Sequence, residues 1–255
     1  MPADMPGPPF SLRRLLWILL LLAAVSAGLY AVFATVGYAW NWQRAWEYRG
    51  QFLRGWLLTL GLSLAAMGLS MVVGLALLLG RRAPVEPLRL LCTGIVEFLR
   101  GSPLLVQLLV GYYILATAVR LDSPLVVGIL LLACFEGAYL AEIFRGAVES
   151  IGASQREAAR AVGFDGWQTW RFVILPQALR RALPGTTGQL VSLIKDSSLL
   201  SVIGVEELVQ KVRILNSGSY TALEGYLPLA VAYLAVTLPL SWYARRLERR
   251  FAYET

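Results

Sequence analysis

The sequence predicts an all-α, polytopic membrane protein with about six transmembrane helices. Of its 255 residues, 57% are apolar and only 15% are charged, a balance too apolar for a soluble domain of this length. Uncharged runs of 20 residues or more recur along the chain, and each can cross a hydrocarbon core of about 30 Å. The basic residues gather in alternate segments between those runs, as the positive-inside rule expects.

The first two predicted spans are long and uninterrupted. Residues 15–36 form an uncharged run of 22 residues, and residues 56–80 form one of 25. Small residues at 24–27 allow a cleaved signal peptide as an alternative for the first run. Because apolar residues continue beyond that point, we expect the first segment to be retained as a helix.

The third predicted span, residues 88–119, contains charges, and its uncharged part, residues 102–119, has only 18 residues. We expect one tilted helix whose cytoplasmic third is polar on one side. The remaining spans are expected at residues 125–144, 183–205 and 225–244.

Sidedness follows from the basic residues. With the N-terminus inside, the inner segments carry fifteen Arg residues and the outer segments six Arg and Lys residues, while Arg100 and Lys195 lie within the membrane. Both termini are therefore expected in the cytoplasm. The net charge of +7 is explained by topology and does not indicate nucleic-acid binding. The external segment 38–48 is rich in Trp and Tyr, which suit the headgroup region of a bilayer.

The composition also excludes several kinds of chemistry. The chain has no histidine, so imidazole-based triads and His metal sites are excluded. Neither of its two lysines follows a glycine-rich turn, so the chain has no Walker A loop for ATP. Cys92 and Cys134 lie in apolar runs, where a small hydrophobic role is favoured over a disulfide or a nucleophile. We expect no catalytic residue, no metal and no bound cofactor in this chain.

One long inner loop, about residues 145–182, differs in character from the spans. Ser154 and Glu157 have the spacing of a capping box, which predicts that a helix starts there. That helix should end at Gly163, since glycine adopts the left-handed conformation most easily.

A second short helix is expected directly after the first. Asp165 can cap it, and Pro176 should end or kink it. The two helices would form a compact knob on the cytoplasmic face, with Phe164 and Trp167 exposed at its tip and in need of a partner or the bilayer surface.

The loop carries a family resemblance. The loop resembles the EAA loop of permease subunits of ATP-binding-cassette importers. The resemblance lies in Glu157-Ala158-Ala159, then Gly163, then Val173-Ile174-Leu175-Pro176. Segments 97–107, 137–146 and 195–204 resemble the polar amino acid branch of that family. The resemblance covers residues 55–250 as an importer transmembrane domain and leaves residues 1–54 as an N-terminal helix with an external aromatic loop. Many members have five spans with the N-terminus outside, so this additional helix places the N-terminus inside.

The resemblance implies a function and a set of partners. The chain would be the permease subunit of an ATP-driven importer of polar amino acids in the bacterial cytoplasmic membrane. It would work with a second permease chain, an ATPase dimer that holds ATP and Mg, and an extracytoplasmic binding protein. The loop residues implied in coupling to the ATPase are Glu157, Ala158, Ala159, Gly163, Phe164, Asp165 and Pro176. The alternative is an ATP-independent channel or scaffold subunit, which has no evident need for such a loop.

Charged residues within the spans must be paired or line a wet cavity. Glu97 and Arg100 are three residues apart on one helix, as are Glu142 and Arg145, so each pair can neutralise itself across one turn. For Arg100, which is followed by Ser102 and a proline, a structural role and a role in the substrate path remain equally open.

A second set of charges is expected near the bilayer midplane. Glu136 and Lys195 fall at similar predicted depths, and Asp196 cannot face Lys195 because adjacent residues on a helix diverge. One hypothesis is a polar cavity lined by these three residues with Ser197 and Ser198, suited to a zwitterionic amino acid. The alternative is a buried Glu136–Lys195 ion pair that joins two helices. The sequence does not name the amino acid.

Overall fold

The computed structural model describes residues 12–36, 40–219 and 222–251, and within these ranges it contains helices and no strand. The contacts divide the chain into two units, residues 1–42 and residues 43–255. The all-α class predicted from the sequence is confirmed.

The first unit contains helix α1, Leu12–Val36. Its stretch Leu15–Thr35 is long and apolar enough to cross a membrane, and none of that stretch is buried within the protein. Moving this apolar surface out of water is favourable, so α1 is suited to a lipid environment. After α1, the rings of Trp40 and Trp42 stack at 5.6 Å.

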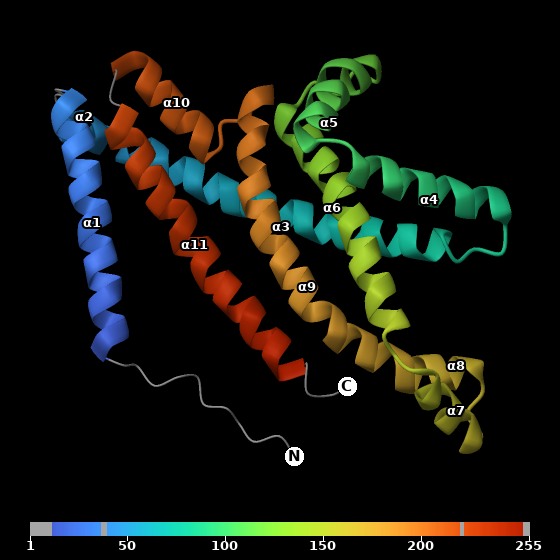
Figure 1. Ribbon diagram of the computed structural model, residues 1–255. Coiled ribbons are helices and arrows are strands. Elements are labelled where there is room, and N and C mark those ends of the chain that lie inside the picture. The colour runs from blue at the N-terminus through green and yellow to red at the C-terminus, as the bar shows by residue number, and fades with distance from the viewer. Residues whose placement is uncertain (1–11, 37–39, 220–221, 252–255) are drawn as a thin grey trace. The chain divides into compact units, whose positions relative to one another are not determined.

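Long helices packed closely together form the centre of the second unit (Figure 1). They are α3 (Arg49–Gly80), α6 (Pro124–Glu149) and α9 (Leu175–Asp196), which continues as the 3-10 segment η3 (Ser197–Ile203). The α3–α6 crossing depends on glycine, because a Cβ on Gly74 would lie 2.9 Å from the carbonyl oxygen of Gly137. Buried leucines such as Leu62, Leu132 and Leu193 fill the core between these helices.

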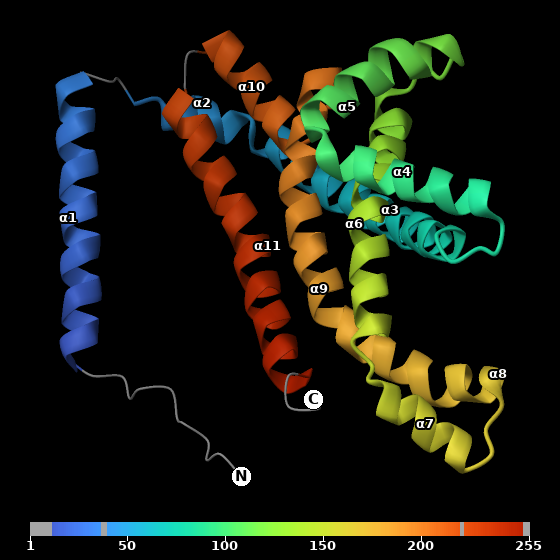
Figure 2. The same ribbon diagram turned by 45° about the vertical axis from the view of Figure 1, so that its right-hand side comes forward.

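The third predicted span is broken, so the expectation of one tilted helix is wrong. Helix α4 (Glu86–Gly101) and helix α5 (Leu104–Val110), which continues as the π-helical segment η1 (Gly111–Ala116), meet at an angle of 111°. Pro103 disfavours a helical conformation for the residue before it, and Ser102 is extended with φ −118° and ψ 150°. Helix α4 consequently lies beside the second half of α3 (Figure 2).

The remaining elements complete the bundle. They are α2 (Trp42–Glu47), α7 (Ala153–Ala161), α8 (Gly166–Gln168), the π-helical η2 (Thr169–Ile174), α10 (Leu208–Ser219) and α11 (Ala222–Phe251). The described residues contain four helices that can each span a membrane, or six spans if each of two bent helix pairs counts as one. Helices α7 and α8 project from the end of the bundle where α6 ends and α11 also ends (Figure 1). Cys92 is buried, Cys134 is exposed, and both are free thiols.

Candidate functional site

Helix α7 forms the first half of the predicted knob, but its start is not the predicted capping box. The N-cap residue is Gly152, no side chain caps the helix, and Ser154 lies inside its first turn. The capping interpretation of Ser154 and Glu157 is therefore wrong. It fails because the S-x-x-E pattern works only when the serine is the N-cap, and the chain enters the helix two residues earlier. Glu157 is instead exposed on the surface of α7.

The end of α7 is as predicted. Gly163 has φ +87°, in the left-handed region that disfavours residues with a Cβ. Its amide donates to the carbonyl oxygen of Arg160 at 3.0 Å, and the amide of Phe164 donates to that of Ala159 at 3.0 Å. These two bonds satisfy carbonyl groups that the helix end would otherwise leave unpaired.

Asp165 caps the next helix, as the sequence predicted, and does so in a reciprocal arrangement. Its Oδ1 accepts a hydrogen bond from the amide of Gln168 at 2.7 Å, and the Gln168 side chain accepts from the amide of Asp165 at 2.9 Å. The knob thus contains a true capping box, at Asp165 and Gln168 rather than at Ser154 and Glu157. The turn from Gly163 to Asp165 is fixed at both sides by the local sequence.

Pro176 neither ends the second helix nor isolates it from the following span. The chain passes from α8 through the π-helical η2 into α9 without leaving the helical state, and Pro176 occupies the first turn of α9. The wider π turn precedes the proline, whose missing N–H is tolerated in a first turn. The knob is therefore continuous with α9, so a displacement of one can move the other.

Side-chain contacts hold the knob against the bundle. Val148, Ile151, Ile174 and Ala178 form a small buried cluster between α6 and α9. The Arg181 guanidinium donates to the carbonyl oxygen of Ser150 at 2.6 Å and to its hydroxyl at 3.0 Å. Both ends of the loop that carries α7 are thus fixed.

The tip of the knob exposes aromatic surface. Trp167 is 70% exposed. Phe164 is less exposed than Trp167. It is half-buried because the centroid of the Phe172 ring lies 6.2 Å from its own. A large exposed indole at the tip is the feature that most needs a partner surface.

Charged residues of α3, α4 and α6 form one cluster around Glu142. The Glu142 carboxylate accepts from Arg145 at 2.6 and 3.1 Å and is bonded to Arg81 at the end of α3. Arg100 lies 3.9 Å from the same carboxylate and stacks over Tyr139. The predicted Glu142–Arg145 pair is confirmed.

The predicted Glu97–Arg100 pair is wrong, because the rotation of α4 turns Arg100 toward α6. The nearby Ser102 hydroxyl donates to the carbonyl oxygen of Phe98 at 2.8 Å and accepts from the side chain of Gln107 at 2.8 Å. That glutamine, which the sequence analysis did not single out, also donates to the carbonyl oxygen of Leu99 at 2.7 Å. It satisfies backbone and side-chain oxygens at the helix break.

The three charged residues expected near the midplane differ in burial: Glu136 is buried, Asp196 is half-buried and Lys195 is exposed. Glu136 is fully buried and accepts a hydrogen bond from Gln189, and Asp196 contacts the same carboxyl group. Lys195 is exposed and forms no ion pair with Glu136, so the alternative of a buried Glu136–Lys195 bridge is wrong. Lys195 lies a residue before the end of α9, and its charge acts on the neighbouring Asp196.

The two serines that follow Asp196 begin the 3-10 segment η3. The Ser197 hydroxyl is buried and donates to the carbonyl oxygen of Ile194 at 2.7 Å, while Ser198 is half-buried. Ser197 thus bonds within its own segment and also to Tyr233 of α11, and Lys195 is the accessible charge of this region.

Sequence reasoning missed a second buried carboxylate, Glu207. It is fully buried and caps α10 by accepting from the amides of Val209 and Gln210 at 2.9 Å each. The hydroxyls of Thr59 and Tyr233 each lie 3.4 Å from it, which joins α3, α10 and α11. Its position directly before Leu208, the first residue of α10, was the available signal, since a carboxylate is favoured at a helix N-terminus.

The structure is a multi-pass helical bundle with buried carboxyl groups, Glu136 and Glu207, and a fixed helical knob at one end. This architecture fits a membrane transport subunit. Residues 72–253 match the family described as binding-protein-dependent transport system inner membrane component, and the chain belongs to this family. It is therefore a permease subunit of an ATP-binding-cassette transporter and a multi-pass protein of the inner membrane.

Curated relatives are similar over most of their length. The glutamine transport system permease protein GlnP of Escherichia coli (strain K12) is 38% identical over 213 residues, which are 82% of this chain and 97% of that protein. The probable glutamine ABC transporter permease protein GlnM of Bacillus subtilis (strain 168) is 34% identical over 200 residues, 78% of this chain and 92% of that protein.

Solved structures agree with the fold. A crystal structure of an amino acid ABC transporter with histidines matches with a TM-score of 0.78 and 31% identity, and covers 84% of this chain and 100% of that one. An inward-facing MetNI methionine ABC transporter matches with a TM-score of 0.63 over 80% of this chain and 98% of that one. At 22% identity it supports the fold alone.

Proposed function

We propose that this chain moves polar amino acids inward across the bacterial cytoplasmic membrane and is driven by a separate ATPase that docks on the α7–α8 knob. The substrate class is supported by relatives named for glutamine transport and for glutamate, glutamine, aspartate and asparagine transport. The docking role is supported by the geometry of the knob.

The observation that carries the docking proposal is the Gly163 turn followed by the Asp165–Gln168 capping box. Together they hold α7 at a fixed angle to α8, and α8 is continuous with α9. A packed helix pair with two discrete positions can pass a displacement from an ATPase to the spans, which a floppy loop cannot. The proposed coupling residues are Glu157, Ala158, Ala159, Gly163, Phe164, Asp165 and Pro176.

The proposed complex contains two permease chains, identical or related, with an ATPase dimer on the cytoplasmic side and an amino acid-binding protein outside. ATP and Mg belong to the ATPase. This chain binds no cofactor and catalyses no reaction. Both of its termini face the cytoplasm, as the distribution of basic residues supports.

The proposed substrate path follows the polar groups of the spans. An amino acid carries one positive and one negative charge, and the accessible Lys195 can attract its carboxylate while Asp196, with Glu136 behind it, attracts its ammonium group. Discontinuous helices near the midplane are common hosts for such sites, and α9 changes to η3 at Asp196. The proposed path residues are Arg100, Ser102, Glu136, Lys195, Asp196, Ser197 and Ser198.

Co-purification tests the docking proposal. The tagged chain is expressed with the genes beside its own, extracted in mild detergent, and its bound proteins are identified by mass spectrometry. Glu157→Lys, on the exposed surface of α7, should lose the ATPase. Glu86→Lys should keep it, because Glu86 is a 71% exposed side chain at the start of α4, outside the knob.

Two results would contradict the proposal. A stable membrane assembly with no nucleotide-binding partner would favour an ATP-independent channel or scaffold. Equal retention of the ATPase by both variants would show that α7 is not the docking surface.

A further inference from the structure

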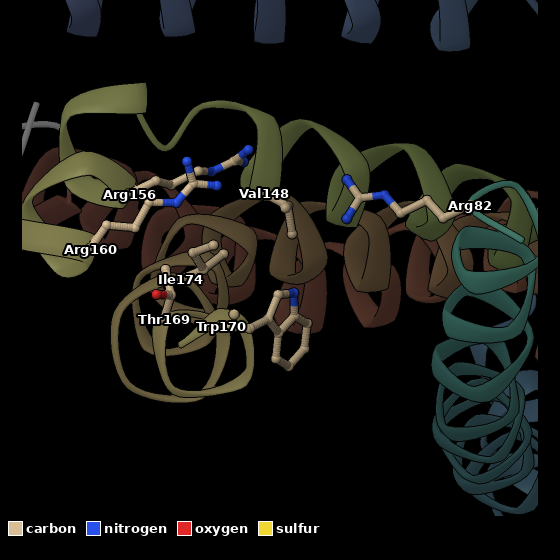
Figure 3. Close-up of a pocket in the computed structure, with 8 residues that line it drawn as sticks. Arg82, Val148, Arg156, Arg160, Thr169, Trp170 and Ile174 are labelled. Atoms are coloured by element: carbon tan, nitrogen blue, oxygen red, sulfur yellow. The ribbon is translucent and has the colours of Figure 1, made fainter. Parts of the chain in front are cut away.

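A cavity of about 240 Å³ lies between the knob and the ends of two spans, and three arginines line it. Arg156 and Arg160 come from α7, and Arg82 follows the end of α3. Figure 3 shows the Arg82 side chain extending toward the side of the cavity where Arg156 and Arg160 lie. Thr169 adds a hydroxyl to this lining.

The cavity has a strong excess of positive charge. No acidic residue lines it, and within the described part of the chain none of the three arginines forms an ion pair. The acids nearest in sequence lie outside the lining: Glu157 is exposed on α7, Glu149 pairs with Arg145, and Asp165 caps α8. Three guanidinium groups that line one cavity without a carboxylate repel each other, so an anion in the cavity is favoured.

Part of the cavity lining is apolar. Val148, Trp170 and Ile174 line it, and the indole of Trp170 is 37% exposed. An anion that fits this lining carries both a charged group and a hydrocarbon portion. A free inorganic anion would leave the apolar side uncovered.

The cavity lies at the ends of two candidate spans, where lipid headgroups are expected. Arg82 lies two residues after the candidate span Arg49–Gly80, and Val148 lies in the last turn of the candidate span Pro124–Glu149. Two spans therefore reach the edge of the hydrocarbon region at this cavity. Tryptophan favours the same interfacial depth, and basic pockets at the cytoplasmic ends of transmembrane helices suit anionic headgroups.

From this geometry we propose that the cavity binds the phosphate of an anionic phospholipid of the inner leaflet, with its acyl chains against the apolar side. The forked donors of the arginines match phosphate oxygens. The inference rests on the proposed topology, which places the cavity on the cytoplasmic side. Since the lipid would contact α7, α3 and η2 together, it would link the knob to the spans.

Native mass spectrometry of the purified chain, titrated with phosphatidylglycerol or with zwitterionic phosphatidylcholine, tests the site. The wild-type chain should bind one phosphatidylglycerol more tightly than the others. Each Arg→Gln change at positions 82, 156 and 160 should weaken that binding about fivefold, and the triple variant should weaken it about a hundredfold. Arg→Lys at the same positions keeps the charge and should lose only part of the affinity.

A matched control removes the same charge elsewhere. The combined Arg245→Gln, Arg246→Gln and Arg249→Gln variant changes residues near the end of α11 that line a separate cavity with Trp242, and it should leave the tight binding event unchanged. Equal losses in the two triple variants would show diffuse attraction of lipid to the basic face, which overturns the proposal. So would equal binding of the two lipids by the wild-type chain.

Two further results would assign the cavity to another anion. If millimolar inorganic phosphate displaces the lipid, the site recognises free phosphate. If the pocket triple variant loses the ATPase in co-purification with its lipid binding unchanged, the arginines contact acidic residues of that protein. Because lipid binding is measured on the isolated chain, it succeeds or fails independently of ATPase docking.

Discussion

Gly163→Ala is the perturbation whose effect can be worked most directly from the structure. Gly163 has φ +87°, and a Cβ built on it meets no atom within 4 Å. The cost of alanine is thus conformational rather than steric crowding by neighbours, about 1–2 kcal/mol for a left-handed residue. This energy corresponds to a roughly 5- to 30-fold smaller population of the fixed α7–α8 geometry.

Gly166→Ala is the matched control. Gly166 lies three residues further along, a Cβ there also meets no atom within 4 Å, and its φ is not positive. As the first residue of α8, alanine should leave the loop unchanged or slightly stabilise it. The two variants therefore differ in backbone conformation alone.

Hydrogen–deuterium exchange of the purified chain measures the loop directly. Amides of residues 153–168 should exchange 5- to 30-fold faster in Gly163→Ala than in Gly166→Ala, by the same estimate. In proteoliposomes with the ATPase and binding protein, Gly163→Ala should lower substrate-stimulated ATP hydrolysis, and Gly163→Pro should abolish transport while the protein still inserts. Equal exchange in the two alanine variants would refute the reasoning that Gly163 fixes the knob.

Three other predictions test single contacts. Asp165→Ala removes the capping box and should destabilise the loop by about 1 kcal/mol, whereas Asp165→Asn retains a cap and most of the stability, as exchange of the loop amides will report. Glu142→Ala leaves three arginines without their shared carboxylate and should lower the free energy of unfolding by on the order of 3 kcal/mol. The Tm in detergent should fall by several degrees. Glu149→Ala breaks only an exposed pair and should lower the free energy of unfolding by less than about 1 kcal/mol. Lys195→Met should abolish substrate uptake but leave expression and size-exclusion elution normal, because the exposed Lys195 forms no ion pair that joins it to another helix. An aggregated or absent protein would contradict this exposed position.

Local signals in the sequence predicted local structure well. Gly163 as a helix end and Asp165 as a cap are both present in the structure, since each depends only on residues within one turn. The EAA-type pattern also indicated the correct family. The same kind of reasoning failed at Ser154, because a capping pattern does not state which residue is the N-cap.

Contacts between helices were predicted less well. The sequence allowed Arg100 either to pair with Glu97 on its own helix or to line a substrate path, but the break at Pro103 and the packing of α4 turn it to Glu142 on α6. Glu136 was expected to face Lys195 or a shared cavity, and its hydrogen-bond partner, Gln189, was not foreseen. Depth follows from counting residues along a helix, whereas rotation about the helix axis follows from what the helix packs against.

The sequence by itself determined the all-α membrane class, the approximate spans and the two-helix knob, because these depend on apolar run length, charge placement and residues within a few positions of each other. Only the tertiary structure decided that Glu142 gathers three arginines, that Glu207 joins three helices and that Arg82 lines one cavity with the arginines of α7. Each of these arrangements brings together residues far apart in the chain, and the close packing of α3 on α6 through glycine sets which side chains can meet.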